Sequence, residues 1–226
     1  MTTAPDASRP GSPPELPEGD LLALTDWRRR VAELYAEVRR LAGADPLAAL
    51  ERWRAVRSDL YRTHPQSPVP PSERAAFRPL HFDPDPRLRF ELPLEADPEA
   101  GAAAGRRALP VSAGGEMTFT RIGWLTVPFP EGRRRLAVYW LHGYAGGLFL
   151  PFRDATNGRA TYGAGRYVLD TAKGADLGGD PARGTLVVDF NFAYQPSCAF
   201  DARWACPLAP PENRLDLEVR AGERIA

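Results

Sequence analysis

Ionisable and hydroxyl side chains gather between residues 153 and 194, at the ends of predicted strands or beside glycine turns. In an antiparallel sheet, neighbouring hairpins bring such ends together, and an apolar wall with a few convergent polar groups is typical of a ligand pocket. Arginine would orient an anionic or carbonyl group, and tyrosine would supply an apolar wall with a polar tip. We therefore expect a pocket for a small molecule, with anions favoured, built from Arg153, Asp154, Tyr162, Arg166, Tyr167, Asp189, Asn191 and Tyr194.

Asp189 is the member of this set for which the sequence most clearly predicts burial. It follows the apolar run 186–188 and precedes Phe190, in a strand that otherwise reads as buried. A buried carboxylate needs a partner, and Arg166 is the candidate cation. Such a pair either ties two strands together or serves a ligand or a reaction, and the sequence leaves both roles open.

Two other functions compete with simple binding. In a hydrolase- or isomerase-like enzyme, Asp154 or Asp189 would act as general acid or base and Arg166 would stabilise developing negative charge. In a structural or interaction module, the same polar residues would only lock the fold and bind no ligand. The sequence does not decide whether the protein is an enzyme, and it predicts no cofactor.

The cysteines are Cys198 and Cys206, and their separation is wider than the Cys-x-x-Cys pairs that commonly bind metal. The three histidines are scattered, so no metal site is predicted. We expect two structural thiols, with a metal site or a reactive thiol at Cys198 and Cys206 as the alternative. A disulfide is disfavoured in a reducing cytosol.

Composition excludes further classes. Lys+Arg 29 against Asp+Glu 29 leaves a formal net charge of +0, which argues against nucleic acid as a partner. Lys173 is the single lysine, and we attribute the excess of arginine to codon bias. The glycine pattern 163–165 precedes a predicted strand, not a helix, so it indicates a turn and no dinucleotide site. No Gly-x-Ser-x-Gly nucleophile motif is present.

Two amphipathic helices are predicted to form an N-terminal arm over residues 21–64. Apolar residues recur at three- and four-residue steps from Leu24 to Leu41, and Gly43 is placed to end the first helix. Asp45 and Pro46 are a strong start signal for a second helix, which Pro65 ends. Both apolar stripes contain tryptophan, so we expect the arm to pack on the main domain.

Residues 65–226 are predicted to form an antiparallel β domain. A proline-rich stretch comes first, and then a period of two sets in at Leu88. Short strands follow between glycine turns, the last at 185–190 and 215–219. This pattern is typical of a β-barrel or β-sandwich, so the fold class is mainly β with N-terminal helices.

Residues 1–20 are rich in proline, serine and acid, and we expect a disordered tail there. This tail lacks the features of a signal peptide, and no stretch approaches the length of about 20 apolar residues that spans a bilayer. We therefore expect a cytoplasmic protein with no membrane partner. The oligomeric state does not follow from the sequence.

Several unusual segments resemble a bacterial family called domain of unknown function 1684. They cover residues 64–68, 151–156, 161–167, 189–191, 193–194, 198–200, 206–208 and 211–213, and the likeness extends over roughly residues 50 to 224. Gln195 departs from the asparagine expected before the proline. The resemblance implies a shared fold, and it implies no established activity.

Overall fold

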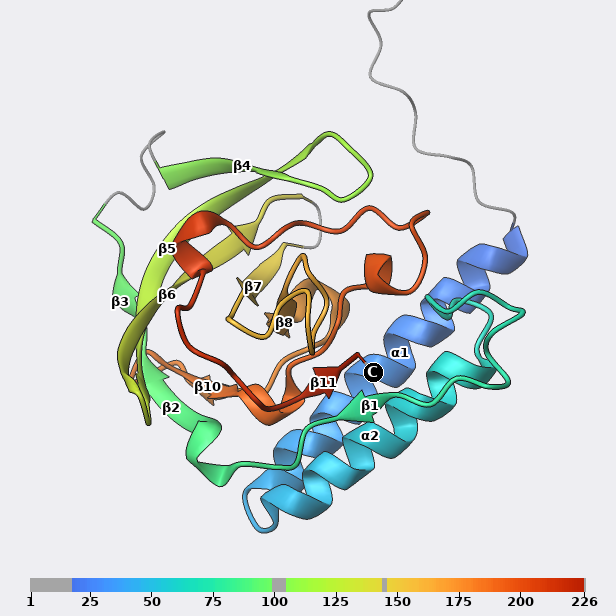
Figure 1. Ribbon diagram of the computed structural model, residues 1–226, viewed down its shortest axis with the longest axis horizontal. Helices are drawn as coiled ribbons and strands as arrows, with labels where there is room; N and C mark the ends of the chain where they lie inside the picture. Colours follow the sequence, from blue (N-terminus) through green and yellow to red (C-terminus); the bar gives the residue numbers. More distant parts are fainter. Residues whose placement is uncertain (1–17, 99–104, 144–145, 226) are drawn as a thin grey trace, which may run out of the picture.

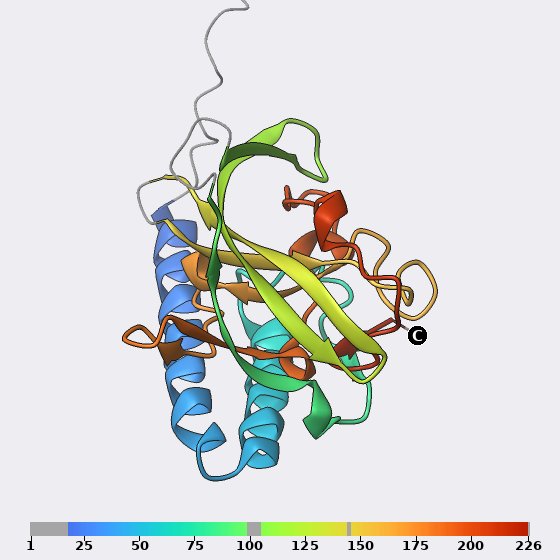
Figure 2. The ribbon, with the colours of Figure 1, turned by 90° about the vertical axis from the view of Figure 1, so that its left-hand side faces the viewer.

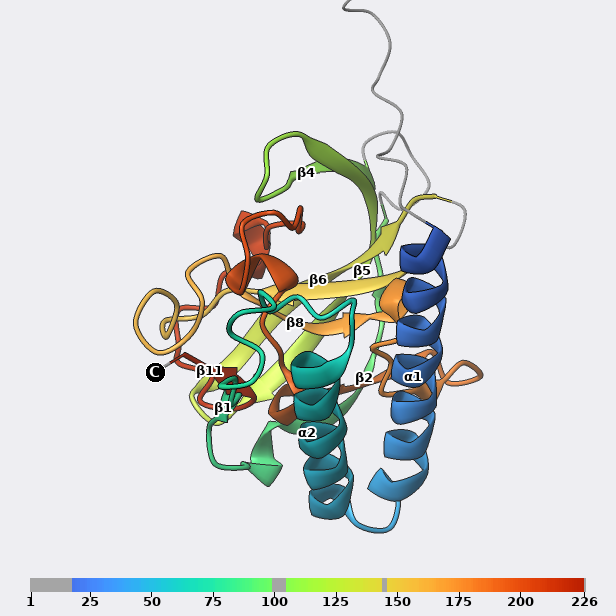
Figure 3. The same cartoon turned by 90° about the vertical axis from the view of Figure 1, so that its right-hand side faces the viewer.

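Two helices open the folded part of the chain in the computed structural model, which describes residues 18–98, 105–143 and 146–225. Helix α1 covers Glu18–Ala42 and helix α2 covers Pro46–Thr63. They lie side by side as an antiparallel hairpin (Figure 3). The predicted start of α2 is confirmed, because the Asp45 carboxylate accepts a hydrogen bond from the amide of Ala48 at 3.0 Å. His64 caps its other end.

Most strands belong to one antiparallel sheet with the path β3-β5-β6-β7-β8, and β4 pairs with β5 beside β3. The central hairpin of β5 and β6 is long and twisted (Figure 2). The bounds are β3 Glu95–Ala96, β4 Arg106–Pro110, β5 Glu116–Phe129, β6 Gly132–Leu141, β7 Gly147–Phe152 and β8 Arg166–Asp170.

Two smaller antiparallel sheets complete the β region. One has the order β2-β10-β9, and the other pairs β1 with β11 near the C-terminus (Figure 1). Their bounds are β1 Leu80–His81, β2 Arg89–Pro93, β9 Gly179–Asp180, β10 Thr185–Asp189 and β11 Glu223–Arg224. Within the described ranges, none of the three sheets closes on itself, so antiparallel sheets after two helices are confirmed and the choice between barrel and sandwich stays a prediction.

The helices and the sheets share one apolar core. Leu34, Val38 and Trp53 from the helices belong to the same buried cluster as Phe119 and Leu150 from the main sheet. The Trp53 indole donates to the Tyr35 hydroxyl inside this layer, so the polar end of the ring is satisfied. Residues of the helices and of the main sheet are therefore buried against the same core.

The predicted strand at 215–219 is wrong. Leu215, Leu217 and Val219 are buried at alternate positions, which gives the segment its period of two. Its backbone does not join a ladder. Leu215 donates to the carbonyl of Arg153, and the Val219 amide donates to the Asp154 carboxylate at 2.7 Å. Alternate burial along an irregular segment produced a strand-like pattern.

The described helices contain no stretch long and apolar enough to cross a bilayer. The predicted disordered tail, residues 1–20, falls largely outside the described residues.

Candidate functional site

The structure does not bring the eight predicted site residues together. Arg166 lies at the start of β8 and is fully buried. Its Nη2 is 3.4 Å from Asp154 Oδ2, so the predicted pairing of Arg166 with Asp189 is wrong. The Arg166 guanidinium also donates to the carbonyls of Val219, at 2.8 Å, and Glu223, at 3.2 Å. This cation therefore fastens the C-terminal segment to the sheet.

Asp154 is also occupied by its neighbours. The Thr156 hydroxyl lies 2.9 Å from both carboxylate oxygens, and the Val219 amide donates to Oδ2. The Asp154 side chain is fully buried. Asp154 and Arg166 thus satisfy each other and the backbone in the interior. Arg153 next to them contributes backbone hydrogen bonds to residues 213 and 215.

Asp189 lies elsewhere, at the end of β10. It accepts hydrogen bonds from the backbone and side-chain amide of Asn191, at 3.0 and 2.8 Å, and its Oδ2 is 3.4 Å from Arg89 Nη1. Burial raises the pKa of Asp189, although Asn191 and Arg89 oppose the shift. Together with Pro84 and Leu47, these residues border a groove of about 430 Å³ beside the loop between the helices.

The tyrosines of the predicted set lie in a third place. The rings of Tyr167 and Tyr194 meet edge to face at 5.9 Å, and both line a small cavity of about 70 Å³ behind α1. Burial raises the pKa of both hydroxyls well above the ordinary value, so both stay protonated. Tyr162 contacts the Cys198 thiol instead, and burial is the largest cause that raises its pKa to about 12.

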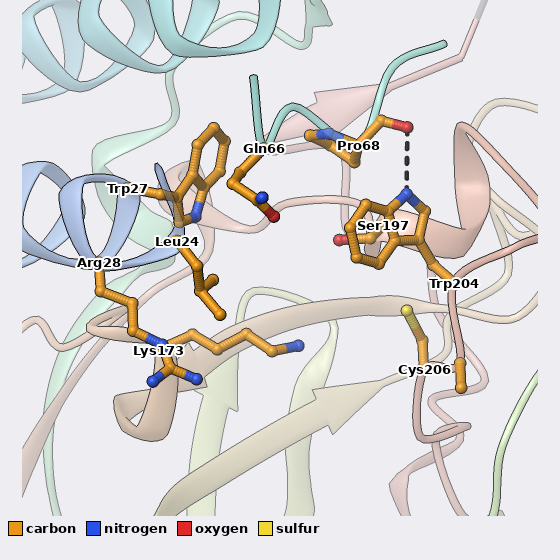
Figure 4. A pocket seen from close by; sticks show the side chains of 10 residues that line it. Leu24, Trp27, Arg28, Gln66, Pro68, Lys173, Ser197, Trp204 and Cys206 are labelled. Atoms are coloured by element: carbon orange, nitrogen blue, oxygen red, sulfur yellow. Dashed lines mark hydrogen bonds between the residues drawn. The ribbon is translucent and has the colours of Figure 1, made fainter. Parts of the chain in front are cut away.

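A larger cavity, of about 140 Å³, adjoins this one, and we call it the α1 pocket (Figure 4). Trp27, Lys173 and Ser197 line both cavities, so the two cavities are neighbours. The α1 pocket is lined by Leu24, Trp27, Arg28, Gln66, Pro68, Lys173, Ser197, Trp204, Ala205 and Cys206.

Four distant segments build the walls of the α1 pocket. Trp27 belongs to α1, and its ring stacks on Tyr61 of α2 at 5.9 Å. Trp204 closes the opposite wall, because its indole nitrogen donates to the carbonyl of Pro68 at 3.3 Å (Figure 4). Lys173 comes from the short 3-10 helix Thr171–Lys173 that directly follows β8. The fold thus places an indole ring on each side of the ammonium group.

The α1 pocket is cationic. Lys173 Nζ lies 3.4 Å from Asp170 Oδ2, and this carboxylate raises the pKa of Lys173, so the lysine stays charged. The Lys173 side chain is nevertheless 61% exposed, and its ammonium group has three hydrogens to donate. Arg28 lines the same pocket.

Two free thiols lie at one end of the α1 pocket, and Cys206 is the one that lines it. The amide of Cys198 donates to Cys206 Sγ at 3.3 Å, and both residues are buried. A hydrogen bond from the Cys206 thiol lowers the pKa of Cys198, with further help from the hydroxyls of Ser112 and Tyr162. The described residues contain no group of three histidine, cysteine or acidic side chains that could hold a metal ion.

Sequence reasoning missed Lys173, Arg28, Trp27 and Trp204 as lining residues. Trp27 belongs to the predicted apolar stripe of its helix, and the attribution of the many arginines to codon bias gives them no functional meaning. One feature of the sequence could have indicated Lys173. It is the single lysine of the chain, and it lies three residues after Asp170 and close to the predicted cluster of polar residues.

Comparisons with known proteins give a family. One solved structure, an uncharacterized protein of Haloarcula marismortui determined by NMR in solution, is similar at 30% identity with a TM-score of 0.56. The match covers 80% of this chain and 95% of that chain. No curated protein matches. The family model described as a protein of unknown function, DUF1684, matches residues 75–224. The chain therefore belongs to the DUF1684 family.

Proposed function

We propose that this protein binds a small anionic molecule that carries one flat apolar ring, in the α1 pocket. The observation that carries the proposal is Lys173, whose charged end lines a cavity walled by Trp27 and Trp204 (Figure 4). Two indole rings provide apolar, flat surfaces, and an ammonium group between them provides a charge for an anion.

The size of the cavity limits the ligand. A cavity of about 150 Å³ is enough to hold a benzene ring. The α1 pocket, at about 140 Å³, therefore suits a single ring, and the adjoining cavity of about 70 Å³ leaves room for a short substituent. That second cavity is where Tyr167 and Tyr194 of the predicted binding set would contribute.

Charge sets the preference for an anion. Lys173 and Arg28 line the pocket, whereas Asp170, the acidic partner of Lys173, is 7% exposed in its side chain. Because the charged end of Lys173 reaches the cavity (Figure 4) and its negative partner is covered, a carboxylate gains more attraction there than a neutral group.

The proposal is tested with benzoate and with benzamide, its neutral counterpart, by calorimetry and by the fluorescence of the tryptophans. We expect benzoate to bind with a Kd of about 1 mM, and benzamide to bind more weakly. The substitution Lys173→Gln should remove the difference between the two compounds. Arg29→Gln is the matched control, because Arg29 is the exposed neighbour of Arg28 and pairs with Asp26 outside the pocket. Equal binding of benzamide and benzoate to the wild type would contradict the preference for anions.

A second candidate, an acid–base enzyme, has support at Asp189. This carboxylate has a raised pKa and borders a groove of about 430 Å³, whereas Asp154 and Arg166 are occupied in the interior. A screen of p-nitrophenyl esters between pH 5 and 8 tests for hydrolysis. Any activity of the wild type should be lost in Asp189→Asn, and activity that survives this substitution would remove Asp189 from the chemistry.

A further inference from the structure

The thiols of Cys198 and Cys206 are close enough to react with each other. The Cys198 amide reaches Cys206 Sγ at 3.3 Å, and the two thiols are joined by a hydrogen bond. The backbone amide of Cys206 donates to the Ser112 hydroxyl at 3.0 Å, which fixes one end of the pair. The pair is free and not oxidised.

Only one of the two sulfur-bearing residues lines the α1 pocket. Cys206 is part of the pocket wall, whereas Cys198 lies behind it, near Tyr162. Figure 4 shows the Lys173 side chain extending across the pocket toward the side where Cys206 lies. The hydrogen bond with Cys198 and burial raise the pKa of Cys206 well above its ordinary value, and the ammonium charge of Lys173 opposes this shift in part. A reagent that enters the pocket therefore meets Cys206 beside a positive charge.

We propose that Cys206 and Cys198 form a thiol–disulfide exchange site that takes a small anionic organic disulfide from the α1 pocket. The preference for an anion rests on the same cations as the proposed function, whereas the reaction of the two thiols does not depend on a bound aromatic ligand.

The reaction balances without a further reagent. Cys198, whose pKa is lowered, first loses its proton to solvent. The Cys198 thiolate then takes the proton of Cys206 along the hydrogen bond that joins them, and the Cys206 thiolate so formed attacks one sulfur of the disulfide RSSR. A bond forms between Cys206 and that sulfur, the S–S bond of RSSR breaks, and RS⁻ leaves and takes up a proton. Cys198 then loses its proton and attacks the Cys206 sulfur of the mixed disulfide, which expels the second RS⁻. The protein dithiol is oxidised by two electrons, and RSSR is reduced to two RSH.

The local chain is suited to the change of geometry. A disulfide requires the sulfurs to approach to about 2.05 Å with a defined torsion angle. Between the cysteines, the 3-10 helix Ser197–Ala199 gives way to irregular chain, and Ala202 and Arg203 are exposed. Within this segment, the Trp204 amide donates to the carbonyl of Asp201 in a turn. The segment contains no strand, so a small movement of its backbone that brings the two sulfurs together need not disturb the sheets.

The experiment uses the full chain, dithiodiglycolate as the anionic disulfide and cystamine as the cationic one. Intact-mass spectrometry follows the reaction of the folded protein, and circular dichroism verifies that each variant is folded. With dithiodiglycolate, the wild type should lose two hydrogens in mass without gaining a group, and dithiothreitol should reverse this. Cys198→Ser should stop at one mercaptoacetate adduct on Cys206.

Comparison of variants removes the intrinsic difference between the two reagents. Lys173→Gln should slow the reaction with dithiodiglycolate by about fivefold and leave cystamine unchanged or faster, whereas Arg29→Gln should alter neither rate. Absence of an internal disulfide in the wild type, or modification only after unfolding, would overturn the exchange site. Equal slowing of both reagents by Lys173→Gln would overturn the preference for anions. Benzoate binding is measured separately, so failure of the proposed function is told apart from failure of the exchange site.

Discussion

Arg57 of α2 donates two hydrogen bonds to the carboxylate of Glu223 in β11, from Nε to Oε1 at 2.5 Å and from Nη2 to Oε2 at 3.2 Å. The Glu223 side chain is 2% exposed, and it also accepts from the backbone amide of Gln195 at 2.8 Å. The Arg57 guanidinium lies over the rings of Tyr61 and Tyr194, at 4.3 and 4.7 Å from their centres. This pair joins the helical hairpin to the last strand of the chain.

Removing one member of the Arg57–Glu223 pair should destabilise the protein more than removing both. Arg57→Met leaves a buried carboxylate without its cation, which typically costs 3 to 5 kcal/mol, about as much as Glu223→Gln costs by orphaning the guanidinium. The double variant removes both charges and should lose less free energy of unfolding than either single variant. Urea unfolding of the four proteins measures this coupling, and strictly additive losses would contradict it.

The Arg166–Asp154 pair should prove structural. Arg166→Met orphans the Asp154 carboxylate and leaves the carbonyls of Val219, Ala221 and Glu223 without their donor. We expect a loss of about 3 to 5 kcal/mol in the free energy of unfolding. Hydrogen exchange should become faster in residues 217–223 before it does in β5 and β6.

The exposed ion pair between Arg220 and Glu218 supplies the control for this prediction. Arg220→Met lies in the same segment, but its charge is in water, so it should cost less than about 1 kcal/mol. A loss for Arg166→Met as small as that of the control would show that the buried pair does not hold the segment.

The start of α2 and the strand β2 could be predicted from the sequence because each depends on residues that are close together in the chain. Asp45 and Pro46 act within one turn of the chain, and the helix begins where they place it. The alternation from Leu88 onward likewise led to β2, because a strand with one buried face needs no knowledge of its partner. Such patterns depend only on residues that are close in sequence, so they can be recognised from the sequence alone.

Partners distant in sequence were the part that could not be predicted. Asp189 and Arg166 each needed an opposite charge, but several charges of each sign were available. The antiparallel register of β2 and β10 sets Arg89 opposite Asp189, and the turn after β7 returns Asp154 to Arg166. The α1 pocket is harder still, since Trp27 and Trp204 are 177 residues apart and meet only through the packing of α1 on the C-terminal loops.

His81 should make the protein less stable in acid. Burial lowers its pKa to about 4, with Arg54 and Arg57 acting in the same direction and Glu223 against it. Its Nε2 makes no hydrogen bond among the described residues, and its ring lies 6.0 Å from that of Trp53. The unfolded chain therefore binds a proton near pH 6.5 that the folded chain refuses, so stability falls as the pH drops from about 6.5 toward 4.

The loss attributable to His81 should be roughly 2 kcal/mol, less than the full shift because the ring keeps some contact with water. Urea unfolding of wild type and His81→Phe at several pH values isolates it, since other acidic groups contribute equally to both. The difference in stability between the two proteins should shift in favour of His81→Phe below about pH 6. A constant difference would contradict a lowered pKa in the folded state.

Gly222 should tolerate no side chain, because two separate constraints act on it. Its φ of +75° is a conformation that residues with a Cβ rarely adopt, and an added Cβ would lie 2.3 Å from the carbonyl oxygen of Ala193. Gly184 provides the matched control, with φ +64° and no atom within 4 Å of an added Cβ. Gly184→Ala should cost about 1 kcal/mol from backbone strain alone, and Gly222→Ala should cost about 2 kcal/mol more from the added overlap. Urea unfolding distinguishes the two, and similar losses would mean that the contact between Gly222 and Ala193 relaxes freely.

Because Gly222 precedes Glu223, Gly222→Ala should also weaken the Arg57–Glu223 pair, so the cost of Arg57→Met should be smaller in that background than in the wild type.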